Sequence, residues 1–391
     1  MTSTSPETGL YIETAPALHD LCATLARSPY IALDTEFVRE KTYYAQLCLI
    51  QVATDDVVAC IDPLRLEDLN PLWEVLERTD IVKVFHAGGQ DLEIFHQLTG
   101  RLPRNLFDTQ IAATVLGFGE QIGYAALVQA LLDIELDKSM SRTDWSQRPL
   151  SPAQLRYAED DVRHLRRVYA LQRARLNEQG REDWLREDFL ALEDPARYEQ
   201  AADQAWTRLR GVHHLRGVQL AVAQRIAAWR EDRARHENRP RRWFLPDELI
   251  LDLSKLMPRA PRELHALRGW PRGVMESHGP RLLELIQQAR ELPEGQWPEL
   301  APRLRLSEEQ EIAALLVQTA LRIQSEAHGV SPATFAGNRE VEALVAGERA
   351  LPLLTGWRRR LAGETALAVL EGQLAIGLRD GRAQLYPATP V

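Results

Sequence analysis

A short apolar run that ends in two carboxylates constrains this chain more than any other feature. Residues 31–37 read Ile-Ala-Leu-Asp-Thr-Glu-Phe, which predicts a buried β-strand. Side chains two residues apart on a strand share a face, so Asp34 and Glu36 should project together while Thr35 points away. Two unpaired buried carboxylates are unfavourable unless a cation neutralises them, and hard oxygen ligands suit Mg²⁺ or Mn²⁺. Taken alone, however, an Asp-x-Glu pair is more commonly part of a solvated loop.

The length of the chain predicts two or three domains, because 391 residues exceed one ordinary hydrophobic core. Apolar residues make up 45% and charged residues 26%, as in globular proteins. No apolar run approaches the ~18 residues of a membrane span, and residues 1–10 lack the order of a signal peptide. We therefore expect a cytoplasmic protein that does not enter a membrane.

The three cysteines also indicate a reducing environment. Cys22, Cys48 and Cys60 lie in apolar contexts and form no Cys-x-x-Cys pair. Buried thiols in an odd number and without that spacing are typical of a reduced cytoplasmic protein, and the pattern predicts no zinc site.

The negative charge is concentrated in the first half of the chain. The net charge is −9, with 20 Lys and Arg against 33 Asp and Glu in residues 1–200. Residues 201–300 are basic, with 17 against 13, and residues 301–391 are balanced, with 10 of each. An acidic domain binds a polyanion without strong repulsion only where metal ions or a neighbouring basic surface mediate the contact. Any affinity for nucleic acid should therefore depend on local basic surface.

Hydrophobic periodicity predicts an α/β arrangement in the first half. The expected strands are residues 31–37, 47–53, 57–61 and 81–85. The expected helices are residues 15–26, 69–77, 90–98, 108–116, 124–132 and one from 152 past 176. A polar turn at residues 54–56 predicts a hairpin, and the glycines at 88–89 predict a tight strand-to-helix turn. This order favours a mixed sheet over a fully parallel one. Beyond about residue 195 strand signals almost vanish, which predicts two small helical bundles in tandem.

Two further acidic sites lie along the chain. Asp91 opens a predicted helix, where a carboxylate that complements the helix dipole is the simpler interpretation. Tyr157 and Asp161 are four residues apart on a predicted helix and share one face, which suits metal binding and the orientation of water. Taken alone, this pair is better explained as a partly buried aromatic beside a solvent-facing acid. Asp160 lies off that face and is expected to be solvated, and Asp108 is expected to be structural.

Together these sites stand in the order of the three sequence motifs of the DEDD-y 3′-to-5′ exonucleases. The motifs read Leu-Asp-Thr-Glu-Phe at 33–37, Phe-His-Ala-Gly-Gly-Gln-Asp-Leu at 85–92 and Tyr-Ala-Glu-Asp-Asp-Val at 157–162. Phe-Asp-Thr-Gln at 107–110 and the stretch from Asp137-Lys138-Ser139 to Thr143-Asp144-Trp145 complete the set. This combination is highly specific. Over about residues 10–190 the sequence resembles that family, and within it most closely the bacterial ribonuclease D proteins.

The rest of the chain resembles helicase-and-RNase-D C-terminal (HRDC) domains. The matching stretches run from Phe244-Leu-Pro-Asp247 to Leu256 and from His278-Gly279 to Leu285, and the last ninety residues resemble a second, more divergent copy. The resemblance implies a ribonuclease H-like α/β exonuclease domain with a mixed sheet over residues 1–200. It also implies a first HRDC domain over 201–295 and an HRDC-like domain over 296–391, each a small all-α bundle.

The resemblance implies a catalytic set of four acids and a tyrosine. Asp34, Glu36, Asp91 and Asp161 would hold two Mg²⁺ or Mn²⁺ ions, with Asp34 bridging both. Two such ions ~3.5–4 Å apart can activate water, neutralise the phosphate and stabilise the leaving 3′-oxygen. Tyr157 would orient the attacking water, because a free phenol with a pKa of ~10 is a poor unaided base at neutral pH. No small-molecule cofactor is expected.

Four further residues are candidates for contact with the substrate, each with a structural alternative. His86 would touch the terminal phosphate or nucleotide, or make a structural hydrogen bond. Phe37 would stack on the terminal base, although core packing is the simpler interpretation. Arg241 and Trp243 lie in an aromatic and basic run at residues 239–243. This run favours a nucleic-acid contact and an ordinary solvated loop about equally.

The leading hypothesis is a monomeric, metal-dependent 3′-to-5′ exoribonuclease that releases nucleoside 5′-monophosphates. The resemblance implies single-stranded RNA 3′ ends as substrate, tRNA precursors among them. Two alternatives stay open: an exonuclease of the same chemistry that acts on DNA, and an inactive fold that binds RNA. The presence of all four acids and the tyrosine argues against the inactive version. Other enzyme classes lack support, because the chain has no Gly-x-x-x-x-Gly-Lys, His-Glu-x-x-His or Gly-x-Ser-x-Gly motif.

Overall fold

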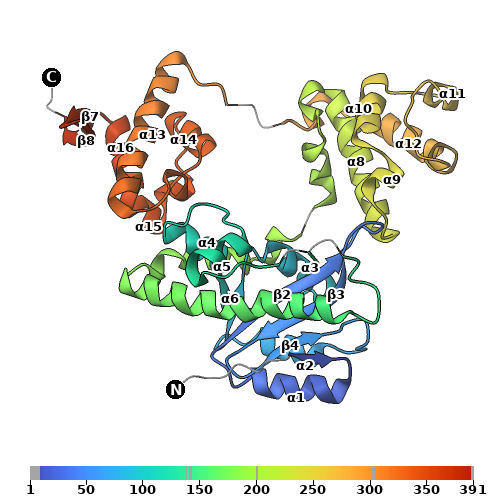
Figure 1. The fold of residues 1–391 in the computed structure, drawn as a ribbon. Coiled ribbons are helices and arrows are strands. Elements are labelled where there is room, and N and C mark those ends of the chain that lie inside the picture. The colour runs from blue at the N-terminus through green and yellow to red at the C-terminus, as the bar shows by residue number, and fades with distance from the viewer. Residues whose placement is uncertain (1–8, 138, 141–142, 200, 301–303, 389–391) are drawn as a thin grey trace. The chain divides into compact units, whose positions relative to one another are not determined.

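The computed structural model describes residues 9–137, 139–140, 143–199, 201–300 and 304–388. The described residues form two compact units. The first unit takes in residues 9–36, 47–194 and 304–388, and the second takes in residues 37–46 and 195–300 (Figure 1). The start of the chain at residues 1–8 and the motif residue Lys138 lie outside the described residues.

The first unit is built on a six-stranded mixed sheet with the order β1-β4-β3-β2-β5-β6. The strands are β1 Leu10–Ile12, β2 Tyr30–Val38, β3 Gln46–Ala53, β4 Val58–Ile61, β5 Val82–Phe85 and β6 Leu106–Asp108. β3 and β4 pair antiparallel, whereas β2 with β5 and β5 with β6 pair parallel. The predicted mixed sheet and hairpin are therefore confirmed. β1 and β6 were not predicted, because three residues are too few to show an alternating pattern.

Helices pack around this sheet, and the longest of them runs across it (Figure 1). They are α1 Ala15–Leu25, α2 Asn70–Leu76, α3 Gly89–Thr99, α4 Thr109–Val115, α5 Tyr124–Leu132, α6 Pro152–Glu178 and α7 Arg186–Leu192. Helix α6 begins with a capping box: the Ser151 hydroxyl accepts from the Gln154 N–H, and the Gln154 side chain accepts from the Ser151 N–H. Its apolar face, including Val162 and Leu165, packs into a core with residues of β2 and β5.

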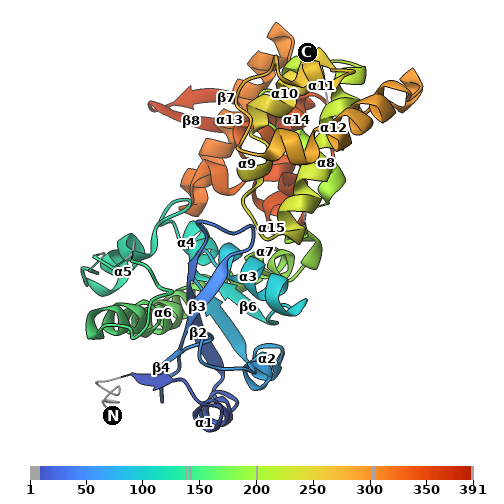
Figure 2. The ribbon, with the colours of Figure 1, turned by 90° about the vertical axis from the view of Figure 1, so that its right-hand side faces the viewer.

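The C-terminal part of the first unit is mainly helical but ends in a hairpin. Its helices are α13 Glu308–His328, α14 Asn338–Val345, α15 Gly356–Arg358 and α16 Glu364–Leu370. The strands β7 Leu374–Arg379 and β8 Arg382–Pro387 then pair antiparallel beside α13 (Figure 2). This hairpin departs from the all-helical expectation. Its signal was the dipeptide Asp380-Gly381 between the stretches Leu-Ala-Ile-Gly-Leu-Arg and Arg-Ala-Gln-Leu-Tyr. Asp-Gly favours a two-residue turn with positive φ at both positions, as found here.

An aromatic stack joins these C-terminal helices to the end of the α/β region. The rings of Trp184 and Trp357 lie parallel, with centroids 4.8 Å apart and an interplanar angle of 8°. The Arg181 guanidinium lies 4.8 Å from the centroid of the Trp184 ring, and that of Arg358 lies 4.5 Å from the centroid of the Trp357 ring. Arg358 also pairs with Asp188 of α7 at 3.0 Å. Residues of both parts therefore share one continuous core.

The second unit combines a helical bundle with the segment 37–46. Its helices are α8 Val218–His236, α9 Arg241–Phe244, α10 Asp247–Leu256, α11 Pro261–Leu264 and α12 Val274–Arg290. Helix α8 packs against both α10 and α12, and residues such as Leu220, Ile250 and Leu282 form their common core. The predicted helical class of this region is confirmed. Among the described residues of the whole chain, no helix has the length and apolar character needed to cross a bilayer.

The stack predicts that Trp357→Ala destabilises the first unit. Trp357 is almost completely buried, and removing a buried tryptophan costs about 3–5 kcal/mol. Urea unfolding followed by circular dichroism would measure the loss. Trp243, which is 45% exposed, provides the control, because Trp243→Ala should change stability by less than about 0.5 kcal/mol. Equal losses in the two variants would show that the stack does not stabilise the fold.

Candidate active site

The end of strand β2 brings three carboxylates together. Asp34 and Glu36 lie near the end of β2, and Asp161 approaches from α6. One oxygen from each side chain lies within 4.8 Å of the other two, and all three side chains are half-buried. The two strand residues therefore share one face, as strand alternation predicts.

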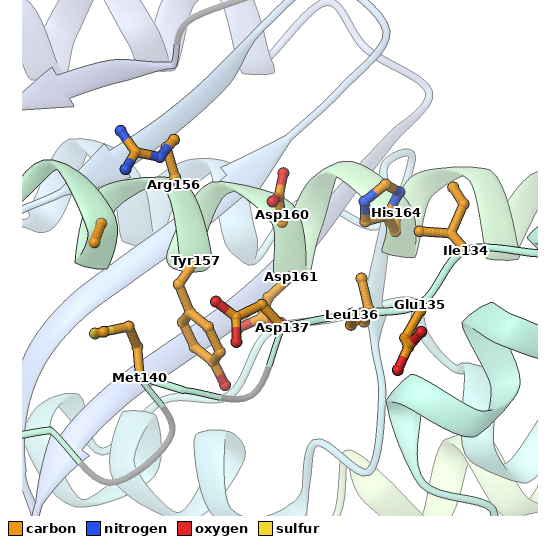
Figure 3. Close-up of a pocket in the computed structure, with 11 residues that line it drawn as sticks. Ile134, Glu135, Leu136, Asp137, Met140, Arg156, Tyr157, Asp160, Asp161 and His164 are labelled. Carbon is orange, nitrogen blue, oxygen red and sulfur yellow. The ribbon is translucent and has the colours of Figure 1, made fainter.

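Helix α6 supplies both Asp161 and Tyr157 from one side. Figure 3 shows these two side chains projecting together from the helix. The Tyr157 ring lies 6.0 Å from the ring of the buried Trp145. The Tyr124 hydroxyl donates a hydrogen bond to the backbone carbonyl of Asp161. These contacts hold the helix at the point where it meets the carboxylates.

Asp91 lies in the first turn of α3, after a turn that Asp108 holds in place. The Asp108 carboxylate accepts hydrogen bonds from the backbone N–H groups of Ala87 at 3.1 Å and Gly88 at 2.9 Å. Ala87 has a positive φ of 56°, and a Cβ on Gly88 would lie 2.6 Å from the Phe85 Cβ. The predicted structural role of Asp108 is confirmed by these hydrogen bonds. The tight turn therefore directs α3, and with it Asp91, toward β2.

A hydrogen bond that the sequence analysis did not predict orients Asp91. Thr35 points away from the face of Asp34 and Glu36, but its buried hydroxyl donates to the Asp91 carboxylate. Asp91 consequently lies outside the group of three acids within 4.8 Å. The signal in the sequence was a threonine at a strand position where a buried apolar residue would be usual.

Burial raises the pKa of all four acids, and repulsion by the other acids of the set adds to this effect at Asp34 and Glu36. Burial, with the charges of Asp161, Asp91 and Glu36, holds the pKa of Asp34 well above its usual range. Burial and the charges of Asp161 and Asp91 raise the pKa of Glu36 to about 8. Burial likewise raises the pKa of Asp91 and of Asp161.

Within the described part of the chain, no Lys or Arg forms an ion pair with any of these four acids. Their hard oxygen donors therefore fit a divalent cation, which would replace repulsion by attraction.

A cavity of about 320 Å³ lies beside this group of acids (Figure 3). Tyr157 and Asp161 line it, together with Asp137 from the segment opposite α6. Burial and the charges of these and neighbouring acids raise the pKa of the Tyr157 phenol, which therefore stays protonated at neutral pH. Asp160, on the same cavity wall, is largely exposed and lies 3.5 Å from Arg163, in agreement with its predicted solvation. Asp137 was present in the sequence motif, but its place beside Tyr157 was not predicted.

His86 makes the structural hydrogen bonds that were one of its two predicted roles. Its Nε2 lies 3.0 Å from the Ile122 carbonyl oxygen, and its Nδ1 lies 2.9 Å from the Thr109 hydroxyl. Burial lowers the pKa of the imidazole. The Ile122 carbonyl can only accept, so the Nε2 atom donates in that contact. Contact between His86 and the substrate stays a prediction.

The other predicted substrate contacts lie in the second unit. Phe37 is half-buried at the end of β2. The Arg241 guanidinium pairs with the buried Glu231 at 2.5 Å. Trp243 is 45% exposed, with the Arg239 guanidinium 5.6 Å from its ring. Contact of these residues with nucleic acid stays a prediction.

Comparison with known proteins identifies the family. A family model described as 3′-5′ exonuclease matches residues 10–175, and one described as HRDC domain matches residues 219–286. The chain is 41% identical over 380 residues to ribonuclease D of Gluconacetobacter diazotrophicus, with 96% of each chain covered. It is 42% identical over 367 residues to ribonuclease D of Granulibacter bethesdensis, covering 93% of this chain and 92% of that one. The chain belongs to the ribonuclease D family.

Structural comparison agrees with this assignment. The crystal structure of Escherichia coli RNase D, described as an exoribonuclease involved in structured RNA processing, matches with a TM-score of 0.84 and 34% identity. The match covers 93% of this chain and 99% of the Escherichia coli chain. The chain is therefore a 3′-5′ exoribonuclease whose family depends on divalent metal ions, and the ribonuclease H-like fold followed by a helical HRDC region is confirmed.

The raised pKa values predict that metal-free protein loses stability as the pH rises. A carboxyl group whose pKa is higher in the folded state binds its proton more tightly there, so its contribution is present at low pH and is lost as the pH rises through the folded-state value. For Glu36 that value is about 8. Thermal unfolding in chelator should therefore show a falling midpoint between about pH 5 and about pH 8. Mg²⁺ should restore more stability at the higher pH, where the acids are ionised.

Removing one of the charges gives a matched test. Asp34→Asn should raise the unfolding free energy in chelator by about 1–3 kcal/mol. It should also abolish the increase in stability that Mg²⁺ gives the wild-type protein. Asp20→Asn, at an exposed site on α1, should change neither quantity. A metal-free protein whose stability stays constant over this pH range would contradict the repulsion account.

Proposed function

We propose that this exoribonuclease releases nucleoside 5′-monophosphates with two divalent cations, Mg²⁺ or Mn²⁺, held by Asp34, Glu36, Asp91 and Asp161. One observation carries the proposal: three of these carboxylates converge within 4.8 Å beside Tyr157, and no basic side chain of the described chain pairs with them. Such an arrangement is unfavourable without cations and suits them as ligands.

The four acids differ in their surroundings, which suggests distinct roles. The charges of Asp161, Asp91 and Glu36 all act on Asp34, which would therefore be the central ligand of the divalent cations. Glu36 and Asp161 would complete the site that holds the attacking water. Asp91, oriented by the Thr35 hydroxyl, would support the second cation directly or through water. Bound divalent cations would supply a water of lowered pKa and neutralise charge on the phosphate.

Tyr157 is proposed to orient the attacking water by a hydrogen bond. Its pKa is raised by burial and by the neighbouring acids, so the phenol remains neutral and is unsuited to act as a base. It keeps a hydroxyl that both donates and accepts beside Asp161, where the cavity gives room for the end of a substrate.

The proposed substrate is the 3′ end of single-stranded RNA, including the 3′ extensions of tRNA precursors. The Escherichia coli relative is described as acting in structured RNA processing, which supports this choice. His86 and Phe37 are proposed to contact the terminal nucleotide. Arg241 and Trp243 are proposed to contact RNA in the basic middle region, where the exposed Trp243 ring is available for stacking on a base.

We further propose three domains, residues 1–200, 201–295 and 296–391, acting as a cytoplasmic monomer. The family matches at residues 10–175 and 219–286 fall inside the first two. Cys22, Cys48 and Cys60 are buried thiols, which suits a reducing compartment.

The central test is degradation of a 5′-labelled single-stranded RNA with Mg²⁺, with Mn²⁺ and with chelator. A ladder that shortens from the 3′ end should form only with metal. Asp34→Asn should slow it about a thousandfold or more, since charge stabilisation by the metals is worth several kcal/mol. Tyr157→Phe should slow it about 10–100-fold through loss of water orientation.

Asp20→Asn is the control and should leave the ladder unchanged. Intact RNA under every metal condition, with RNA still bound, would instead favour the inactive RNA-binding hypothesis. Equal or faster loss of a matched DNA strand would favour the DNA exonuclease.

The charge distribution predicts that RNA affinity falls steeply with salt, because binding would depend on local basic surface. Trp243→Ala should weaken binding by about 1–3 kcal/mol at every salt concentration, whereas Arg242→Gln should reduce the salt slope by about one. Fluorescence anisotropy of a labelled RNA from low to high salt measures both effects. An affinity that does not change with salt, or with Trp243→Ala, would indicate that residues 239–243 are an ordinary solvated loop.

A further inference from the structure

His164 lies on the same face of α6 as Tyr157 and Asp161, but the proposed chemistry does not use it. The three residues follow one another at spacings of four and three, which places them on one side of an α-helix. All three line the cavity of about 320 Å³ beside the acids. Figure 3 shows His164 beyond Asp161 along the helix, toward the end of the cavity where Ile134 and Glu135 lie. His164 therefore belongs to the wall that a bound RNA end would meet.

The position of His164 relative to Asp161 puts it near the reacting part of a substrate. An α-helix rises 1.5 Å per residue, so the two positions are about 4.5 Å apart along the axis. Asp161 is a proposed ligand of the cations that bind the scissile phosphate, and a sugar is attached to that phosphate on each side. A side chain one turn further along α6 is therefore placed to contact one of these sugars.

The imidazole of His164 has hydrogen-bonding capacity that the protein does not use. Neither ring nitrogen forms a hydrogen bond with a described residue, although Nδ1 is buried. Burial and three arginines of α6 lower the pKa of the ring, and the charge of Asp160 opposes them, so the ring is neutral at pH 7. A neutral imidazole has one N–H donor and one acceptor nitrogen. Polar atoms in such places usually have a partner, and here a ligand in the cavity can supply it.

The charge of the cavity wall decides which part of RNA suits this position. The described residues that line the cavity include one arginine and four acids, namely Arg156 against Glu135, Asp137, Asp160 and Asp161. This excess of negative charge would repel a further phosphate. A hydroxyl group, in contrast, can donate to a carboxylate and exchange a hydrogen bond with a neutral imidazole. Ribose offers such a group as its 2′-hydroxyl, which deoxyribose lacks.

We propose that His164 is a specificity-determining residue that hydrogen-bonds a ribose 2′-hydroxyl beside the reacting phosphate and thereby favours RNA over DNA. The inference rests on the proposed function, because the phosphate must lie at Asp161. His164 is not among the residues whose ligand atoms converge within 4.8 Å, so its role is separate from metal binding. Two-metal chemistry acts on a phosphodiester that RNA and DNA share, so selection of the sugar requires a contact of this kind.

The test uses the full chain with Mg²⁺ and measures removal of the last nucleotide from four 5′-labelled oligomers of one sequence. One oligomer is all ribose. The other three carry a single 2′-deoxyribose at the last, second or third nucleotide from the 3′ end. In the wild-type protein one of these replacements should slow removal about three- to tenfold, which is the effect of one lost hydrogen bond.

Three variants assign this penalty to the imidazole. His164→Phe keeps a ring without nitrogens, so it should slow removal from the all-ribose oligomer about three- to tenfold and reduce the deoxyribose penalty to less than about twofold. His164→Gln should keep the penalty, because its side-chain amide can take the place of a ring nitrogen. His19→Phe, at an exposed position of α1, is the matched control and should behave as wild type.

The outcomes separate the inference from the function on which it rests. A wild-type protein that acts equally fast on all four oligomers would overturn the inference, and so would a penalty that His164→Phe leaves unchanged. Equal slowing of His164→Phe on all four oligomers, together with weaker Mn²⁺ binding, would show that His164 acts on the metal site instead. If the wild-type protein showed no Mg²⁺-dependent removal even from the all-ribose oligomer, the proposed function itself would be wrong.

Discussion

Repulsion between carboxylates opposes folding of the first unit, because folding brings four acids close together. Asp34 and Glu36 share a strand face, Asp161 faces them from α6, and Asp91 lies near enough to raise the pKa of both strand residues. A fold that placed these side chains only by their own preferences would separate them. The observed arrangement therefore depends on elements that other contacts hold in place, from the capping box of α6 to the Thr35 hydroxyl.

The groups that hold the four acids in place carry no positive charge, and this explains why they do not compete with metal binding. Thr35 and Tyr124 orient their targets through hydroxyls, and Asp108 holds the turn before α3 through backbone N–H groups. None of these groups neutralises the four acids. A lysine or arginine in the same places would fix the acids equally well, but it would compete with the cation for their charge. Supports that carry no positive charge therefore position the acids and preserve their attraction for metal.

Local patterns explain why most of the α/β region could be predicted from the sequence. The periodicity of α5 and the Ser-Pro start of α6 depend on neighbouring residues, and both elements occur where they were expected. The order of the acidic motifs likewise identified the residues that meet at the site. The strands β1 and β6 and the hairpin β7–β8 were missed, because short strands depend on their partners more than on their own pattern. The Thr35 and Tyr43 contacts were missed for a stronger reason: Tyr43 meets residues nearly two hundred positions away, which no local pattern records.

Contacts between residues far apart in the sequence show that the α/β region does not fold independently of the helical regions. The core beneath α6 continues into α13, and the Trp184 ring is covered by Trp357 from the C-terminal helices. The loop after Glu36 belongs to a different unit and encloses Tyr43 among the charges of α8 and α9. A chain that ended after α7 would expose the core face beside Trp184 and leave Tyr43 without its partners. The C-terminal helices therefore complete the core of the α/β region, and α8 and α9 hold the loop at residues 37–46, in addition to any contact that they make with RNA.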